Sequence, residues 1–431
     1  MICDNLSTNE KGHLVFAGVD TIDMAKKYGT PLYLMDEDRI RYNCNLYKNA
    51  MREYFGENSL LLYASKVASF KGIYQIVKDK GIGIDVVSSG EIYTALKAGL
   101  TLENAYFHSN NKTDEDIEYA MDNGIGYFVV DNVEELYVIE QEAKKRNIKQ
   151  GILLRITPGI DPDTLEAIST GKVDSKFGSA IETGQAESIV KYALNLSHIE
   201  LFGFHYHIGS QVFDADVYIQ STDIMMDFIK DMKDKFGYQT LELDIGGGFG
   251  VRYREEDPIL DIANEIRRIG KFIHNKAKEL SISVPKILME PGRSIVGDAG
   301  LTLYTVGTIK TIPGYKNYVS VDGGMSDNPR FALYGSPYTV YIANKMNNEK
   351  TFVADLVGRL CESGDIIQKD VSLAETQRYD IVAVLTTGAY NYSMASNYNR
   401  LTRPPIVMLK DGLDRVVVKR ESLEDLIRND I

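Results

Sequence analysis

Short apolar runs alternate with longer amphipathic segments through the middle of the chain. Between about residues 60 and 297, the segments after the runs repeat apolar residues at spacings of three and four, as in Thr113–Asn123 and Val133–Arg146. This alternation predicts strand–helix units repeated around a parallel sheet. Roughly eight runs can be counted, the number that closes a (β/α)8 barrel. They are Leu61–Val67, Gly83–Ser88, Ala105–Asn110, Tyr127–Asp131, Gly151–Ile156, Leu201–Ile208, Leu241–Ile245 and Lys286–Glu290.

The pattern changes after residue 297. Strand-like stretches such as LTLYTVGTIKTI and NYVSVDGG are now separated by Gly, Asn and Asp turns, which predicts an antiparallel β domain. The N-terminal stretches HLVFAG and PLYLMDE are also strand-like, and we assign them to the same domain. We therefore predict an α/β chain with a TIM barrel over residues 37–297 and a β-sheet domain formed by residues 1–36 and 298–431.

Composition narrows the possible partners. A chain of 431 residues exceeds the size at which one hydrophobic core keeps growing, which agrees with two domains. The 48 basic and 61 acidic residues give a net charge of −13, which argues against nucleic acid or an anionic membrane surface as partner. The three cysteines show no metal-ligand spacing, and neither an export signal nor a membrane-length apolar run is visible. We expect a cytoplasmic protein without a metal.

Barrel enzymes place their functional residues at the C-terminal ends of the strands. The first run ends in Tyr63-Ala64-Ser65-Lys66, so a lysine follows an apolar strand. Desolvation there would favour the neutral amine, which can attack an aldehyde. Taken alone, Lys66 is more simply interpreted as a solvated lysine at the end of a strand.

Three further strand ends carry candidate chemistry. The glycines of 246–248 expose bare backbone that can converge on an anion, although a tight turn would also explain them. The loop Glu290–Arg293 adds a carboxylate and a cation at the same end. In the sixth run, the alternation of a strand places His205 and His207 on the same side. They could bind a metal as a pair, or an imidazole could stack on a flat cofactor. Without a third His or Cys ligand, stacking is the better interpretation.

Six strings complete the picture: YASK, HIGSQ, GGGFG, EPGR, CESGD and GAYNYSMASNYN. Together they resemble the motif set of the fold-type III pyridoxal-phosphate-dependent decarboxylases, the class II Orn/Lys/Arg decarboxylases with an alanine-racemase-like barrel. The resemblance covers nearly the whole chain and is strongest to the diaminopimelate decarboxylases. It implies pyridoxal 5'-phosphate as cofactor, a homodimer with shared active sites, and decarboxylation of meso-2,6-diaminopimelate to L-lysine, the last step of lysine biosynthesis.

The resemblance also implies how the barrel residues hold the cofactor. Lys66 would form the Schiff base, His207 would stack on the ring, and Glu290 would keep the ring nitrogen protonated. Other residues would hold the phosphate or lie near the cofactor: Ser210, Gly246, Gly247, Gly248, Pro291, Gly292, Arg293 and Tyr390.

Substrate recognition is implied mainly for the β domain. Two arginines would grip the distal carboxylate, with the planar fork that suits this anion, and Glu362 would pair with the distal ammonium. Cys361 would return a proton after loss of carbon dioxide, although an inert buried thiol is commoner for a lone cysteine. Cys361 and Glu362 would reach the site from the second subunit. The expected substrate contacts are Arg293, Arg330, Tyr334, Glu362 and Tyr390.

Other functions stay open at this point. A related enzyme of the same fold could decarboxylate a basic amino acid such as ornithine or lysine, or a carboxylated polyamine. A non-catalytic homologue could bind a partner protein, as antizyme inhibitors resemble ornithine decarboxylase without its activity. The chain also departs from the family at Phe331, where a proline is usual, so its fine substrate preference is open.

Overall fold

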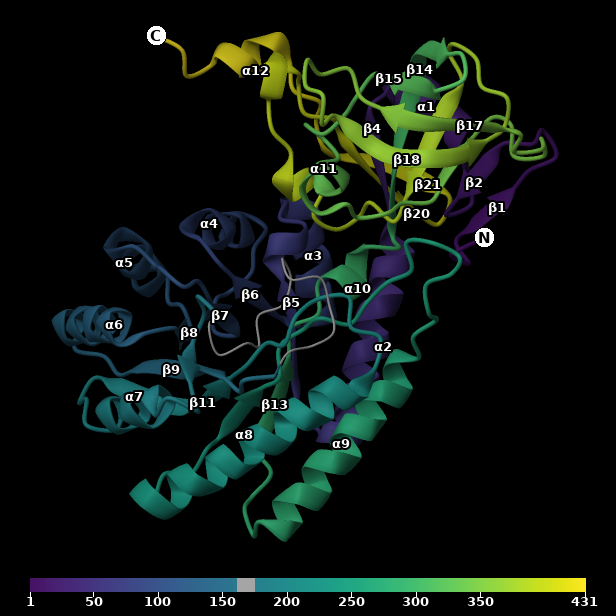
Figure 1. Ribbon diagram of the computed structural model, residues 1–431. Helices are drawn as coiled ribbons and strands as arrows, with labels where there is room; N and C mark the ends of the chain where they lie inside the picture. Colours follow the sequence, from purple (N-terminus) through teal and green to yellow (C-terminus); the bar gives the residue numbers. More distant parts are fainter. Residues whose placement is uncertain (161–174) are drawn as a thin grey trace. The chain divides into compact units, whose positions relative to one another are not determined.

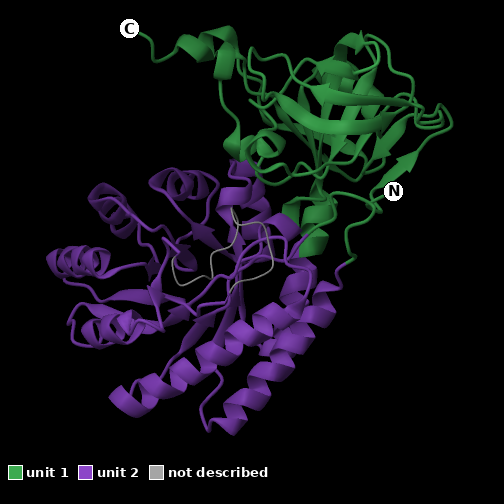
Figure 2. Ribbon diagram, viewed as in Figure 1, with its two compact units in different colours: residues 1–43, 251–259, 295–431 green, residues 44–250, 260–294 purple. Residues whose placement is uncertain are grey.

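The structure is a computed structural model that describes residues 1–160 and 175–431. The described residues form two compact units, drawn in different colours in Figure 2. Unit 1 contains Met1–Asn43, Val251–Ile259 and Ile295–Ile431, and unit 2 contains Cys44–Gly250 and Leu260–Ser294. The segment Val251–Ile259 joins unit 1 although the sequence placed it within the barrel range. Its backbone explains this, because the Tyr253 carbonyl accepts a hydrogen bond from Thr339 Oγ1 at 2.7 Å.

Unit 2 contains a closed barrel of eight parallel strands, which confirms the predicted (β/α)8 fold (Figure 1). The barrel closes where the last strand pairs with the first, Leu288 opposite Leu60. A further short strand, β10 (Ser179–Ala180), pairs with β9 outside the ring. In chain order the barrel strands are β5 (Leu60–Ala64), β6 (Gly83–Val86), β7 (Ala105–Phe107), β8 (Tyr127–Val130), β9 (Gln150–Thr157), β11 (Ile199–His205), β12 (Glu242–Asp244) and β13 (Lys286–Met289).

Helices alternate with these strands, and Figure 1 shows them around the outside of the barrel. Several of these helices begin at a residue whose side chain accepts a hydrogen bond from a backbone N–H group of the first turn. Thr113 forms a capping box with Asp116 at the start of one helix, and Asn132 caps the next. The helices of unit 2 are α2 (Glu37–Phe55), which begins in unit 1, α3 (Lys71–Lys80), α4 (Ser89–Lys97), α5 (Asp114–Asp122), α6 (Val133–Arg146), α7 (Gln185–Ala193), α8 (Ala215–Phe236) and α9 (Ile262–Glu279).

Side chains fill the interior of the barrel. Leu62, Val129, Leu153 and Leu288 pack with Tyr106 in one buried cluster, and the Tyr106 hydroxyl donates to Glu242 at 2.9 Å. The barrel is therefore a packed core, and chemistry is left to the residues at the strand ends.

Unit 1 is built on a large sheet that the N-terminal segment completes, as predicted. Strand β4 (Leu32–Asp36) lies between β14 (Gly300–Ile312) and β20 (Ile406–Lys410). The predicted antiparallel β domain is confirmed, and two of its strand pairs are parallel, β4 with β20 and β15 with β17. The other strands of this sheet are β15 (Lys316–Val321), β16 (Val340–Ile342), β17 (Phe352–Val357), β18 (Ile366–Leu373), β19 (Ile381–Leu385) and β21 (Leu413–Val418).

Both faces of this sheet carry buried apolar residues. Alternate residues of β14 enter two separate apolar clusters: Leu301 and Leu303 belong to one, Tyr304 and Val306 to the other. A small sheet and, among the described residues, four α-helical segments complete the unit. No helix of the described residues is long and apolar enough to cross a bilayer. These elements are β1 (Leu6–Thr8), β2 (Leu14–Phe16), β3 (Val19–Asp20), α1 (Thr21–Tyr28), α10 (Arg293–Val296), which begins in unit 2, α11 (Arg330–Tyr334) and α12 (Leu423–Ile427).

Candidate active site

Lys66 lies directly after the first barrel strand, in a 3-10 turn formed by Ser65–Val67. Its side chain is 42% exposed, and its Nζ lies 3.4 Å from Oδ2 of Asp85, a fully buried residue of β6. A buried carboxylate therefore holds the amine at the barrel mouth while its head stays accessible.

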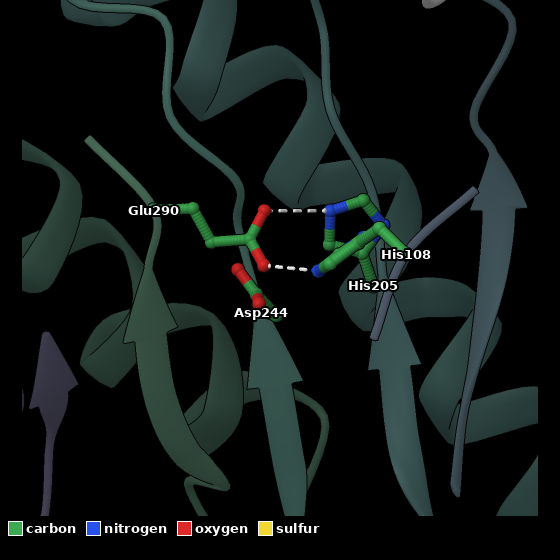
Figure 3. A group of neighbouring side chains, drawn as sticks. All are labelled: His108, His205, Asp244 and Glu290. Atoms are coloured by element: carbon green, nitrogen blue, oxygen red, sulfur yellow. Dashed lines mark hydrogen bonds and ion pairs between the residues drawn. The ribbon is translucent and has the colours of Figure 1, made fainter. Parts of the chain in front are cut away.

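Glu290 follows the eighth barrel strand, and its carboxylate contacts two histidine rings, as Figure 3 shows. His108 Nε2 lies 2.5 Å from Glu290 Oε1, and His205 Nε2 lies 3.2 Å from Glu290 Oε2. All three residues are buried. The two oxygens of one carboxylate thus each face one imidazole, which fixes the plane of the carboxylate.

The charge states in this group follow from burial. Burial lowers the pKa of His205 to about 3, so its ring is neutral and can donate a hydrogen bond. Burial alone would raise the pKa of Glu290, but the facing His108 and His205 lower it by more. The pKa of Glu290 therefore lies well below its usual range. Glu290 is therefore a buried anion held by hydrogen bonds.

The glycine loop after the seventh strand has no room for side chains. A Cβ on Gly246 would lie 2.8 Å from His207 Nδ1, and one on Gly247 would lie 2.1 Å from the Glu290 carbonyl oxygen. Gly248 adopts a φ of +122°, which disfavours other residues. The loop therefore packs bare backbone against the strand ends that carry His207 and Glu290.

The Glu290–Arg293 loop contacts both the lysine turn and Ser210. A Cβ on Gly292 would lie 2.6 Å from the Val67 side chain, beside Lys66. The Arg293 guanidinium is buried and donates to Ser210 Oγ from Nε at 3.1 Å and from Nη2 at 3.0 Å. The structure thus brings together the loops after the first, sixth, seventh and eighth barrel strands.

In unit 1, Arg330 is a buried cation surrounded by phenols and hydroxyls. Its guanidinium stacks over the Tyr253 ring, 4.9 Å from the centroid, and donates to Tyr338 Oη at 3.2 Å and to Ser336 Oγ at 3.1 Å. Tyr334 ends the same helix and is 38% exposed. Tyr390 lies in a loop with a φ of +61°.

The CESGD tract is tied to one other motif string by its backbone and to two nearby backbone N–H groups by one carboxylate. The Cys361 N–H donates to Asn399 Oδ1 at 2.8 Å, which joins CESGD to the SNYN string. Buried Asp365 accepts from the Met325 N–H at 2.6 Å and from the Leu360 N–H at 2.8 Å. The side chains of Cys361 and Glu362 are exposed, so the interpretation of Cys361 as a buried thiol was wrong.

Comparison with known proteins finds relatives along nearly the whole chain. The family model of the pyridoxal binding domain of pyridoxal-dependent decarboxylases matches residues 37–297. Diaminopimelate decarboxylase of Bacillus methanolicus is 44% identical over 415 residues, 96% of each chain. That of Bacillus subtilis is 41% identical, covering 98% of this chain and 96% of the relative. The chain belongs to the diaminopimelate decarboxylase family.

A solved member of the family shares the fold of this decarboxylase. The diaminopimelate decarboxylase of M. jannaschii, solved in complex with L-lysine, aligns with a TM-score of 0.91 and 33% identity over 99% of this chain and 98% of its own. The resemblance inferred from the six motif strings is therefore confirmed.

The barrel end of this decarboxylase fits pyridoxal phosphate, the group that its family implies. Gly246, Gly247 and Gly248 keep this loop free of side chains, because any Cβ there would meet neighbouring protein atoms. A loop of bare backbone is what a phosphate held by backbone N–H groups requires. Burial and the positive charge of Lys66 lower the pKa of His207 well below its usual range, so its ring is neutral and can stack. Buried, ionised Glu290 suits a protonated ring nitrogen.

Sequence reasoning missed part of this site. Asp85, His108 and Asp244 lie around Glu290 or Lys66, and each interrupts or ends an apolar run, which was the available signal. Metal binding by His205 had been set aside because no third ligand was visible. The structure places His108, Asp244 and Glu290 around His205, with one side-chain N or O atom of each within 4.8 Å of the others, and His207 is not part of this group.

A methyl group on the glycine loop tests how the loop is packed. We expect Gly247→Ala to lower the free energy of unfolding by about 1–3 kcal/mol, because its Cβ would meet backbone, and to weaken retention of pyridoxal phosphate. Gly90→Ala is the matched control, since a Cβ there meets only Ser88 Oγ at 3.6 Å within helix α4. Urea unfolding and cofactor dialysis measure both effects, and equal behaviour of the two variants would contradict the packing.

Proposed function

We propose that this chain decarboxylates meso-2,6-diaminopimelate to L-lysine and carbon dioxide with pyridoxal 5'-phosphate, the last step of lysine biosynthesis. The observation that carries the proposal is the pair of Lys66 and ionised Glu290 at one end of the barrel, in a chain that matches diaminopimelate decarboxylases over 96% of its length. The L-lysine bound to the M. jannaschii relative supports the product.

Different barrel residues would bind different parts of the cofactor. Lys66 would hold it through its amine, and the glycine loop with Ser210 and the Pro291-Gly292-Arg293 backbone would hold the phosphate. His207 would stack on the ring, and Glu290 would keep the ring nitrogen protonated. When bound, pyridoxal phosphate supplies an electron sink for the electron pair left as the carboxylate departs.

The remaining residues would bind substrate and move a proton. Arg293 and Arg330 would bind the distal carboxylate, Glu362 the distal ammonium, and Tyr334 and Tyr390 would line the site. As the bond to the leaving carboxylate breaks, carbon dioxide departs and the Cys361 thiol gives its proton to the carbon left behind. Solvent then returns a proton to the thiolate.

We also propose that the chain works as a homodimer with shared sites. The exposure of Cys361 and Glu362 in one chain agrees with residues that a second copy covers. The scattered cysteines support a cytoplasmic location, and the net charge of −13 supports the absence of a nucleic-acid partner.

Mixing two inactive variants tests the shared sites. Lys66→Ala and Cys361→Ala proteins, unfolded and refolded together, should regain about a quarter of wild-type turnover, because half of the dimers are mixed and each holds one intact site of two. Each variant refolded alone is the control. Failure to regain activity, with mixed dimers demonstrated by two affinity tags, would contradict shared sites.

The reaction itself has a direct assay. Protein freed of cofactor and then supplied with pyridoxal phosphate should release lysine and carbon dioxide from meso-diaminopimelate in equal amounts, and neither product without the cofactor. Lysine formation that does not depend on the cofactor would contradict the proposal.

A further inference from the structure

Asp244 is a fully buried acid that the proposed reaction does not use. It is the last residue of β12, two positions before Gly246, and its exposed fraction is 0%. Its Oδ1 accepts the N–H of Gly246 at 2.8 Å. Within residues 1–160 and 175–431, its Oδ2 has no hydrogen-bond partner, which is costly for a buried ionised oxygen.

The side chain of Asp244 faces another carboxyl group. Figure 3 shows it beside Glu290, and one oxygen of each carboxyl lies within the 4.8 Å that the group spans. Two carboxylates this close in a buried place cannot both ionise readily, so the pair shares a proton.

The surroundings decide which of the two acids holds the proton. Glu290 has an imidazole at each oxygen, which stabilises its anion. Asp244 has one backbone donor and one oxygen without any. Burial and the charge of Glu290 raise the pKa of Asp244 well above its usual range. The other charged or titratable groups that act on Asp244 or feel its charge are Asp85, Tyr106, Arg155 and Tyr206.

We propose that Asp244 is a neutral carboxylic acid at physiological pH and acts as a positioning residue, donating its proton from Oδ2 to Glu290. Its role in the reaction rests on the proposed function, in which Glu290 faces the cofactor ring. Asp244 keeps the charge of the pair at minus one and orients the Glu290 carboxylate. Because its other oxygen holds Gly246, the same side chain links the ring-nitrogen partner to the phosphate loop.

The protonation state can be measured without cofactor or substrate. Cofactor-free protein carrying ¹³C-labelled aspartate should show, at pH 8, the infrared carbonyl band of a protonated carboxyl that disappears in Asp244→Asn. Asp327, whose pKa burial raises to about 7, contributes equally to both proteins and cancels in the difference spectrum. Identical wild-type and variant spectra at pH 8 would overturn the proposal.

A second variant keeps the test decisive if Asp244→Asn does not fold. Glu290→Gln removes the neighbouring charge and leaves Asp244 in place, so Asp244 should lose its proton at a pH lower by at least about one unit. An unchanged titration of the Asp244 band would mean that the two acids are not coupled, and would equally overturn the proposal.

The positioning role has its own readout in the loaded protein. Asp244→Ala should shift the pH dependence of the cofactor's visible absorbance, and Asp244→Asn, which can still donate to Glu290, should restore it. If the carbonyl band is present in cofactor-free protein but the loaded protein does not turn over diaminopimelate, the proposed function is contradicted. The protonation of Asp244 would still be supported. No rescue by Asn over Ala would contradict the positioning role.

Discussion

Lys66→Ala should abolish the visible absorbance of bound pyridoxal phosphate and lower turnover of meso-diaminopimelate by on the order of a thousandfold or more. The amine at the barrel mouth lies 3.4 Å from buried Asp85, and we propose that it holds the cofactor. Absorbance spectra after dialysis and steady-state kinetics measure the two effects.

A neighbouring lysine provides the control for this variant. Lys71 is exposed at the start of helix α3, so Lys71→Ala should keep both absorbance and turnover. Retained absorbance and turnover in Lys66→Ala would contradict the account of the barrel site.

Cys361→Ala should lower turnover by about 10²–10⁴-fold, the usual contribution of a positioned acid or base. The cofactor should remain bound, because its expected ligands lie in the barrel, apart from Tyr390. Kinetics with meso-diaminopimelate, together with an absorbance spectrum of the same sample, separate the loss of proton return from the loss of cofactor.

Cys44→Ala is the matched control for the thiol. Cys44 is buried on helix α2, so this variant should lose about 1 kcal/mol of stability to a small cavity while it keeps turnover. If Cys361→Ala turned over at the wild-type rate, another group would have to supply the proton.

The barrel could be predicted because its strands are short, apolar and buried on both faces. Each of the eight runs contains or overlaps a barrel strand, and the capped segment Val133–Arg146 matches helix α6 residue for residue. Such signals are local, since an apolar run and a cap are both read from neighbouring residues.

The topology of unit 1 could not be predicted in the same way. The residue pattern of a strand shows which side chains face the core. It does not show whether a partner strand from a distant part of the chain runs parallel or antiparallel to it. Strand β4 pairs in parallel with β20, opposing Tyr33 and Ile406, and nothing local to either strand indicates this pairing.

In the candidate site too, local features could be predicted and contacts between distant residues could not. Lys66, the glycine loop and Glu290 follow strands and form recognisable strings, so the sequence indicated them. His205 and Glu290 are 85 positions apart, and their contact depends on the closed barrel. The proton on Asp244 is still harder to predict, because it depends on which donors reach Glu290 and which oxygen is left without one.

Substrate selectivity tests the central claim most directly. The measurement is kcat/KM for meso-diaminopimelate, ornithine, lysine and arginine with pyridoxal phosphate added. Because polar groups built for the distal carboxylate would be left unpaired by the other three, we expect meso-diaminopimelate to be preferred by at least about a hundredfold. No turnover of diaminopimelate, alongside turnover of ornithine or lysine, would contradict the account.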